Sequence, residues 1–329
     1  MRPFPLFAAS VLSMQLVTGL GAQTRSVALT IDDLPFVTAN DSRPMQPADA
    51  KQAAAANHKL LMTLARHHVP VIGFVIEKSV EELGIASGTE ILSEWTGRGF
   101  DLGNHSYGHP DFNELTIEQF EDQVTRGEAT FAQLMKAVRR KPEFFRFPFN
   151  HTGDTKEKHD AVAAFLAQHG YRLAPCTIET SDWMFNIAYG RMLARHDEAS
   201  AARLRADYLA FTGAQIDYFI GLDRQVWGYE PPQIMLLHDN RLNADVIEDL
   251  LAIFEKKQFR WVTLREAEKD PAYLAPETFI TKYGPMWGYR WAKERGVQVD
   301  GSREPEPPKW IAEYGKQDPV PPQRARSEY

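Results

Sequence analysis

One stretch near the N-terminus decides the fold, and it reads Ser26-Val27-Ala28-Leu29-Thr30-Ile31-Asp32-Asp33-Leu34-Pro35. The apolar run is rich in β-branched residues, which predicts a buried strand that Pro35 ends. Adjacent residues on a strand point to opposite sides, so Asp32 and Asp33 are expected to have different roles. Two like charges this close are costly unless a positive group lies beside them. Taken alone, such a pair indicates two solvated aspartates of a turn, and only the rest of the sequence favours a functional pair.

The composition of the chain excludes several classes of protein. It has 329 residues, of which 43% are hydrophobic and 25% charged, as in ordinary globular proteins and unlike disordered or fibrous ones. The formal net charge of -7 and the pI near 5.8 argue against a basic nucleic-acid-binding face. We therefore expect no nucleic-acid partner.

The first 22 residues have the pattern of a secretory signal peptide. Arg2 is followed by a mostly apolar run over 6–20, and small residues precede a cleavage site after Ala22. This pattern predicts a periplasmic or secreted protein, and an uncleaved membrane anchor is the alternative. No later segment is apolar and long enough to span a membrane, so we expect no membrane span after signal removal.

Apolar runs and amphipathic stretches alternate from Ser26 onward, which predicts βαβ units and a parallel sheet. Seven strands suit an incomplete or distorted (β/α) barrel, an α/β fold, better than an open doubly wound sheet. After the first strand, the others are expected at 69–76, 100–103, 144–147, 171–175, 234–237 and 259–263. Helices are expected at 50–68, 89–98, from Thr116 to about 140, at 156–169 and at 245–257.

Two regions depart from this alternation. A helical insertion at 184–227 separates the fifth and sixth strands, and we expect it at the edge of the cleft, where it would influence substrate choice. The predicted domain covers 23–268. A proline-rich C-terminal extension follows at 269–329 and is expected to pack partly, with a loose tail. Its tryptophans are expected to pack against the domain rather than stack on sugar rings; they are Trp287, Trp291 and Trp310.

Polar residues follow five of the predicted strands, at the ends that a parallel barrel gathers on one face. Active sites of such barrels are built at this carboxyl face. The five segments are Asp32-Asp33, His105-Ser106-Tyr107-Gly108-His109, Arg146-Phe147-Pro148-Phe149-Asn150, Ser181-Asp182-Trp183 and Leu236-Leu237-His238-Asp239.

His105 and His109 are four residues apart, a spacing that in a helix or a tight turn brings two imidazoles within reach of one metal ion. Two surface histidines are the alternative for this pair alone. With Asp33 they make a set of two histidines and one carboxylate, which leaves positions open for water and substrate.

This ordered series resembles the polysaccharide deacetylase family, the NodB-homology group of carbohydrate esterase family four. Thr30 to Pro35 matches its first motif, and the four other segments match its second to fifth motifs in order. The resemblance covers about 26–265. It implies a distorted (β/α) barrel and a metal-dependent hydrolase that removes acetyl groups from amino sugars.

The resemblance also implies a role for each residue. Asp33, His105 and His109 would hold one divalent metal, most simply zinc, with cobalt, nickel or manganese as alternatives. The implied catalytic residues are Asp32 as general base, Arg146 as its partner, His238 as general acid and Asp182 as the residue that orients it. The Phe149 N–H would help to hold the oxyanion, and Trp183 and Leu236 would form the pocket for the acetyl methyl group.

Departures from the family pattern concern the substrate more than the chemistry. Leu34 and Asn150 stand where the family usually has glycine, which changes backbone freedom and groove shape. The expected partner is an acetylated carbohydrate, either an N-acetylated amino sugar or, for an O-acetyl esterase, an O-acetylated polysaccharide. A non-catalytic carbohydrate-binding protein is the third reading. The sequence leaves the polymer and the oligomeric state open.

Overall fold

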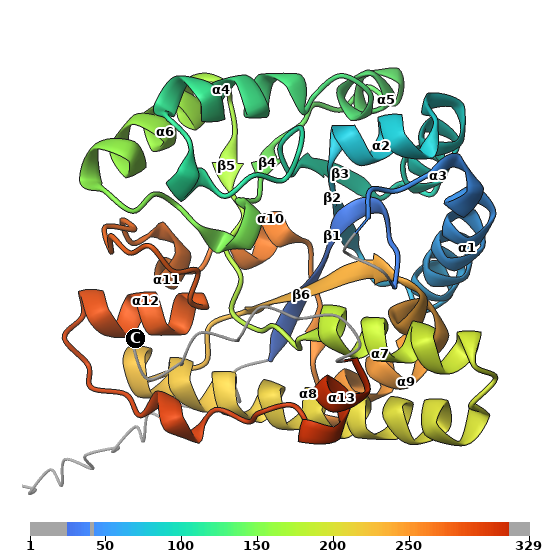
Figure 1. Ribbon diagram of the computed structural model, residues 1–329. Helices are drawn as coiled ribbons and strands as arrows, with labels where there is room; N and C mark the ends of the chain where they lie inside the picture. Colours follow the sequence, from blue (N-terminus) through green and yellow to red (C-terminus); the bar gives the residue numbers. More distant parts are fainter. Residues whose placement is uncertain (1–24, 40–42, 316–329) are drawn as a thin grey trace, which may run out of the picture.

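Seven parallel strands form the sheet at the centre of the molecule (Figure 1). The computed structural model describes residues 25–39 and 43–315, so the predicted signal peptide and the end of the C-terminal tail lie outside the described residues. The strands are β1 (Ser26–Val37), β2 (Val71–Val75), β3 (Asp101–Asn104), β4 (Phe144–Phe145), β5 (Arg172–Leu173), β6 (Gln233–Asn240) and β7 (Arg260–Trp261). Their order is β5-β4-β3-β2-β1-β6, with β7 paired to the start of β1, which confirms the distorted (β/α) barrel.

Strand β1 lies between β2 and β6 and is almost completely buried, as its apolar run predicts. The prediction that Pro35 ends it is wrong, because the strand continues to Val37. The pairing of β1 with β6 is interrupted between Asp32 and Val37. Pro35 therefore falls where the ladder requires no N–H donor. The two aspartates lie at this irregularity.

The helices surround the sheet (Figure 1). They are α1 (Ala50–Arg66), α2 (Glu77–Leu83), α3 (Ile85–Gly97), α4 (Ile117–Arg126), α5 (Phe131–Ala137), α6 (Lys156–Gln168), α7 (Asp182–Ala194), α8 (Glu198–Trp227), α9 (Arg241–Lys256), α10 (Leu264–Ala267), α11 (Pro271–Leu274), α12 (Trp287–Glu294) and α13 (Lys309–Gly315). The helices at 50–66, 117–126 and 156–168 begin where the sequence predicts, whereas those expected to begin at 89 and 245 begin four residues earlier. No helix of the described residues has both the length and the hydropathy that a membrane span requires.

The helix expected from Thr116 to about 140 is two helices, α4 and α5. Thr116 caps α4 through a capping box with Gln119, as expected. The break follows Gly127, whose backbone lies so close to Asn104 that a Cβ would come within 2.6 Å of its Oδ1. The helix pair therefore turns where the chain presses against the end of β3.

The segment at 184–227 is part of the main core, and its influence on substrate choice stays a prediction. Helices α7 and α8 lie side by side and pack against α9, along the flank of β6 (Figure 1). One face of α8 is fully or nearly fully buried, including Leu204, Tyr208 and Phe219. Because it fills the barrel's flank, its removal would open the hydrophobic core rather than a binding groove.

The first part of the C-terminal extension also packs onto the domain. Trp287 and Trp291 on α12 are buried in the main core, and α12 contacts α8. Trp310 is partly buried and its Nε1–H donates to Asp207 Oδ2 at 2.8 Å. These tryptophans are thus packed against the domain, while residues 316–329 are outside the described part.

Candidate metal centre and active site

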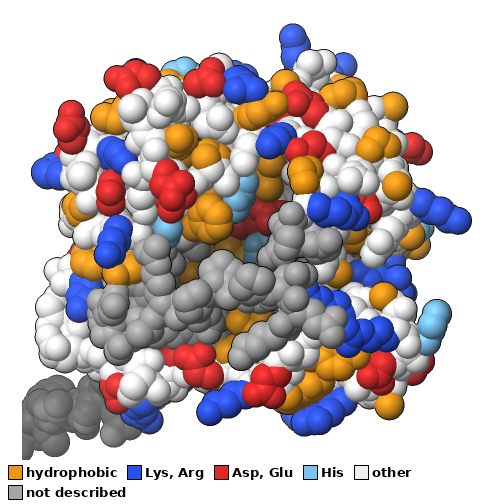
Figure 2. Space-filling model, in the orientation of Figure 1, with side chains coloured by type: hydrophobic (Ala, Val, Ile, Leu, Met, Phe, Trp, Pro, Cys, Tyr) orange, Lys and Arg blue, Asp and Glu red, His pale blue; other side chains and the backbone are white. Residues whose placement is uncertain are grey.

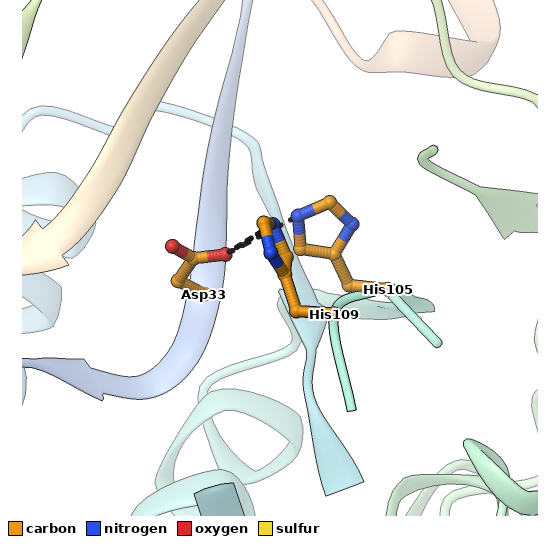
Figure 3. A group of neighbouring side chains, drawn as sticks. All are labelled: Asp33, His105 and His109. Carbon is orange, nitrogen blue, oxygen red and sulfur yellow. Dashed lines mark ion pairs between the residues drawn. The ribbon is translucent and has the colours of Figure 1, made fainter. Parts of the chain in front are cut away.

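Asp33, His105 and His109 converge at the carboxyl end of the sheet (Figure 3). Asp33 lies at the irregularity of β1, and both histidines belong to the loop after β3. Asp33 Oδ1 is 3.2 Å from His105 Nε2 and 3.5 Å from His109 Nε2. On the face seen in Figure 2, acidic, histidine and hydrophobic side chains meet in a hollow.

In the loop that carries the histidines, side-chain oxygens accept hydrogen bonds from backbone N–H groups and so fix its conformation. Asn104 Oδ1 accepts a hydrogen bond from the Ser106 N–H at 2.8 Å, and the His109 N–H donates to Ser106 Oγ at 3.0 Å. Asp33, Ser106 and His109 all have positive φ angles, of 63°, 69° and 53°. Left-handed backbone at non-glycine residues is costly and is held by its surroundings, which is common at functional sites.

The three side chains suit a divalent cation. His105 Nδ1 contacts the Arg146 carbonyl oxygen at 2.8 Å; donation of its N–H there leaves the Nε2 lone pair directed at Asp33. Asp33 Oδ1 is buried and has no hydrogen-bond partner among the described residues. Burial lowers the pKa of His109 to about 4 although Asp33 opposes it, so the imidazole is neutral at pH 7. Two imidazole nitrogens and one carboxylate oxygen form a hydrolytic metal set.

The charge of Asp33 is held by its neighbours. Burial alone would favour the protonated acid, but His109, His105 and His238 outweigh it and keep the pKa of Asp33 well below its usual range. The ionised carboxylate is the form of Asp33 that binds a metal ion.

Asp32 faces Arg146. The strict alternation expected along the strand fails here, because Asp33 has left-handed backbone and both carboxylates approach His105 Nε2. Asp32 Oδ2 is 3.5 Å from Arg146 Nη1 and 3.9 Å from His105 Nε2. Arg146 is fully buried and also donates from Nη2 to Thr30 Oγ1 at 3.0 Å. Asp32 Oδ1 has no hydrogen-bond partner among the residues described, so one carboxylate oxygen remains able to accept a proton.

His238 at the end of β6 is held by Asp182 at the start of α7. Asp182 Oδ1 is 2.6 Å from His238 Nδ1, and its Oδ2 accepts from the His238 N–H at 2.8 Å. Burial favours the neutral imidazole, but Asp182, Asp33 and Asp32 outweigh it and raise the pKa of His238 to about 10. Its Nε2 is 3.8 Å from Asp33 Oδ2, so a protonated imidazole faces the three converging ligands.

The remaining predicted residues lie around this centre. Phe149 is 55% exposed, and its ring stands edge-on to His109 with the centroids 4.6 Å apart. Leu236 precedes His238 by two positions on β6, so it lies on the same face of that strand. Trp183 follows Asp182 in the first turn of α7 and is partly buried. No described contact joins Trp183 or Leu236 to the histidines.

Sequence reasoning missed the amides that support Asp182. Asn240 Nδ2 donates to Asp182 Oδ2 at 3.2 Å, and Asn243 Nδ2 donates to the same oxygen. Tyr208 of α8 in turn donates to Asn243 Oδ1 at 2.9 Å. Asn240 and Asn243 read in sequence as an ordinary helix cap, which Asn240 also provides to α9. Only the folded arrangement brings them to Asp182.

Together, these groups form a cluster of ionisable side chains at the carboxyl face of a parallel α/β barrel. Residues 20–174, somewhat under half of the chain, match the family model described as polysaccharide deacetylase. The match includes Asp32, Asp33, both metal-site histidines and Arg146. Asp182 and His238 lie beyond it and complete the centre through the geometry described above.

Two curated relatives match part of the chain. The uncharacterized protein YlxY of Bacillus subtilis is 26% identical over 125 residues, which are 38% of this chain and 35% of that protein. A peptidoglycan-N-acetylglucosamine deacetylase of Bacillus cereus is 21% identical over 125 residues, 38% of this chain and 40% of that protein. The matched region therefore spans well under half the length of these relatives.

A solved structure shares the fold. It is a mutant, with restored enzymatic activity, of a Bacillus anthracis pseudoenzyme of carbohydrate esterase family 4. The TM-score is 0.50 at 16% identity, over 74% of this chain and 68% of that one. At this identity the similarity shows only that the two proteins share the barrel fold, so any statement about chemistry must come from the site residues.

Proposed function

We propose that the protein is a metal-dependent hydrolase that removes acetyl groups from a carbohydrate, with N-deacetylation of an N-acetylated amino-sugar polymer or oligomer as its reaction. One observation carries the proposal: three metal-type ligands converge beside two further pairs, Asp32 with Arg146 and His238 with Asp182. Amide hydrolysis needs a base for water, stabilisation of an oxyanion and an acid for the leaving amine. These groups supply all three.

In this proposal Asp33, His105 and His109 hold one divalent cation. A cation in that place supplies Lewis-acid polarisation of the acetyl carbonyl and of water. Mixed nitrogen and oxygen ligands favour zinc and accept cobalt, nickel or manganese.

The proton transfers are assigned to the two dyads. Asp32 accepts the proton of the attacking water on its unpartnered Oδ1, while Arg146 holds its other oxygen. His238 donates from Nε2 to the leaving nitrogen, because Asp182 occupies its Nδ1. The Phe149 N–H contributes to binding of the oxyanion, and Leu236 and Trp183 bound the acetyl methyl pocket.

The name of the Bacillus cereus relative supports an amino-sugar substrate of cell-wall type. A periplasmic or secreted location, with residues 1–22 as signal peptide, agrees with such a substrate. An O-acetyl esterase would use the same groups, since a polarised carbonyl and a proton donor serve an ester as well as an amide. The leaving group, amine or alcohol, distinguishes the two reactions.

The test is an assay of the purified, zinc-loaded protein on N-acetylglucosamine oligomers, peptidoglycan fragments and O-acetylated xylan. Acetate released with an equal amount of new primary amine is the expected result. Acetate without amine, from xylan alone, would replace the proposal with the esterase. Failure to release acetate from any of them, with zinc bound at one per chain, would favour a carbohydrate-binding protein.

A further inference from the structure

The loop after β4 is held in a costly conformation. Phe149 and Asn150 both have left-handed backbone, with φ of 57° and 56°. Two consecutive non-glycine residues in this region are unfavourable unless the surroundings impose the conformation. The local backbone bonds of the turn are donated by Asn150 to Phe147 O and by His151 to Pro148 O, so the Phe149 N–H is not one of them.

The first source of support is Arg290 on α12, in the C-terminal extension. Arg290 is fully buried, and its Nη2 donates to the Asn150 carbonyl oxygen at 2.6 Å. Its Nη1 donates to Thr152 Oγ1 at 3.0 Å. The planar guanidinium thus binds the loop at two points, directly after the left-handed pair.

Arg290 is itself held by a charged pair that reaches back to the barrel. Glu277 Oε1 accepts from Arg290 Nη1 at 2.8 Å, and Glu277 Oε2 contacts His159 Nε2 on α6 at 2.5 Å. The Trp287 N–H donates to the Cys176 carbonyl oxygen at 2.8 Å, which fixes the start of α12 beside β5. The arginine therefore cannot shift without breaking buried contacts.

The second source of support is the backbone at Gly284. A Cβ at this position would come within 1.7 Å of the Phe149 carbonyl oxygen and 2.9 Å of its carbonyl carbon. The extension lies directly against the peptide group that follows Phe149. Only glycine permits this approach, so the backbone of the extension packs directly against the backbone of the loop.

We propose that segment 277–290 of the C-terminal extension is a brace for the active-site loop, with Arg290 and Gly284 as positioning residues. The brace holds Phe149 and Asn150 in left-handed backbone, which fixes the direction of the Phe149 N–H and keeps the Phe149 ring beside His109. This inference rests on the proposed deacetylation, in which that N–H binds the oxyanion. It extends the active site to a part of the chain beyond the matched residues 20–174.

The test measures kcat, KM and bound zinc for Arg290→Lys and Gly284→Ala on the best substrate of the wild-type protein. Loss of one oxyanion donor lowers kcat by about 10²- to 10³-fold, and displacement of the donor should cost at least about tenfold. We expect KM to change less than about threefold, because the donor acts on the transition state more than on the bound substrate. Zinc stoichiometry should remain that of the wild type.

Arg290→Lys keeps a positive charge for Glu277 and loses the planar fork. The matched control is Arg295→Lys, directly after the same helix. Arg295 Nε donates to the Val226 carbonyl oxygen at 3.2 Å, and its guanidinium stacks on Trp227. Neither contact involves the loop after β4. The control should keep the wild-type kcat. Thr152→Val removes one acceptor of Arg290 with little change in shape, so it tests the brace if Arg290→Lys does not fold.

Rates are expressed per zinc-loaded, folded molecule, with folding checked by thermal melting. Wild-type kcat in both Arg290→Lys and Gly284→Ala would overturn the brace while leaving deacetylation intact. A loss explained fully by fewer folded molecules would also overturn it, because the extension would then only stabilise the fold. A wild-type protein without deacetylase activity would instead refute the proposed function.

A second readout is binding of a methylphosphonamidate of glucosamine, a tetrahedral anion, followed by calorimetry. Its affinity should fall with kcat in the brace variants and stay unchanged in Arg295→Lys. Unchanged affinity in the brace variants would contradict the proposed position of the Phe149 N–H.

Discussion

The two ends of β6 carry similar pairs with opposite electrical character. At the amino end, Gln233 Nε2 donates to Asp223 Oδ2, a side chain of α8, at 2.9 Å. At the carboxyl end, His238 contacts Asp182, a side chain of α7, at 2.6 Å. Both aspartates are buried, and both pair with the same strand. Only the partner on β6 differs, a neutral amide at one end and an ionisable imidazole at the other.

This difference separates a structural pair from a reactive one. Burial raises the pKa of Asp223 to about 8, with Glu230 acting in the same direction and the Gln233 hydrogen bond opposing it. Asp223 is thus a neutral acid near pH 7. At the other end the charges of Asp182 and His238 compensate each other, and they face three further ionisable groups. A buried carboxylate stays ionised where an opposite charge compensates it, and it is protonated where no such charge lies nearby.

The largest expected effect comes from removing the two imidazole ligands at the carboxyl end. In the variant His105→Ala with His109→Ala, only Asp33 of the converging set remains, and one carboxylate does not retain zinc. We expect almost no bound metal and activity at background. Metal analysis after dialysis measures it. Full occupancy would show that the cation is held elsewhere.

The next effect separates the adjacent aspartates. Asp32→Asn should keep zinc and lower kcat by about 10²- to 10⁴-fold, the usual contribution of a general base, because an amide cannot accept the proton of water. KM should change less. Asp33→Asn should instead weaken metal binding, since a neutral amide replaces an anionic ligand.

Zinc content and rate, measured on the same samples, distinguish the two aspartates. Excess zinc should restore part of the activity of Asp33→Asn and none of that of Asp32→Asn. The reverse pattern would exchange the roles of base and ligand. Equal loss of zinc in both variants would refute the division of roles, in which Asp33 binds the metal and Asp32, beside Arg146, accepts the proton.

A smaller effect is expected for Asp182→Asn at the carboxyl end of β6. The amide still reaches His238, but its loss of charge removes the orientation and the stabilisation of the imidazolium, so kcat should fall about 10²-fold. Tyr208→Phe acts one step further away, through Asn243, and should lose about fivefold or less, the value of one hydrogen bond. Equal losses in both would place Tyr208 in the chemistry rather than behind it.

The sequence predicts the parts of this site that local patterns determine. The ends of the strands are marked by abrupt changes from apolar to polar residues, and topology alone then brings Asp33, His105 and His109 to one face. The pairing of Asp32 with Arg146 and of Asp182 with His238 is implied only by the family resemblance, and the structure brings each pair into contact. Whether each residue has its proposed role remains a prediction, which the variants above test.

The contacts that the sequence does not predict depend on distant packing. Arg290 supports Asn150 across 140 positions of the chain, and nothing in the proline-rich pattern around it indicates that contact. The apolar spacing of α8 predicts a helix but not its burial against β6, so an apparent insertion proved to be core. The break after Gly127 depends on the close approach of Asn104, and helix propensities alone do not predict such a long-range contact.

The smallest effect concerns the amino end of β6 and is measured as stability against pH. The folded pKa of Asp223 is raised to about 8 from 3.8, so between these values the folded protein retains a proton that the unfolded chain releases. Stability is therefore lost as pH rises through this window, by on the order of 1.4 kcal/mol per pH unit from this group. Asp223→Asn is neutral at every pH and should abolish that slope.

The measurement is urea unfolding of both proteins between pH 5 and pH 8, where the variant should gain stability over the wild type as pH rises. Glu230 and Tyr273 lie near Asp223, and burial raises the pKa of Tyr273 well above its usual value, so this phenol stays neutral throughout the range. Asp217→Asn on the same helix is the control, because its side chain is 66% exposed beside Lys257 and should change stability by only about 0–1 kcal/mol. Parallel pH curves for the wild type and Asp223→Asn would mean that Asp223 is ionised in the fold. The contrast between the two ends of β6 would then be a difference of partner only, and not of charge.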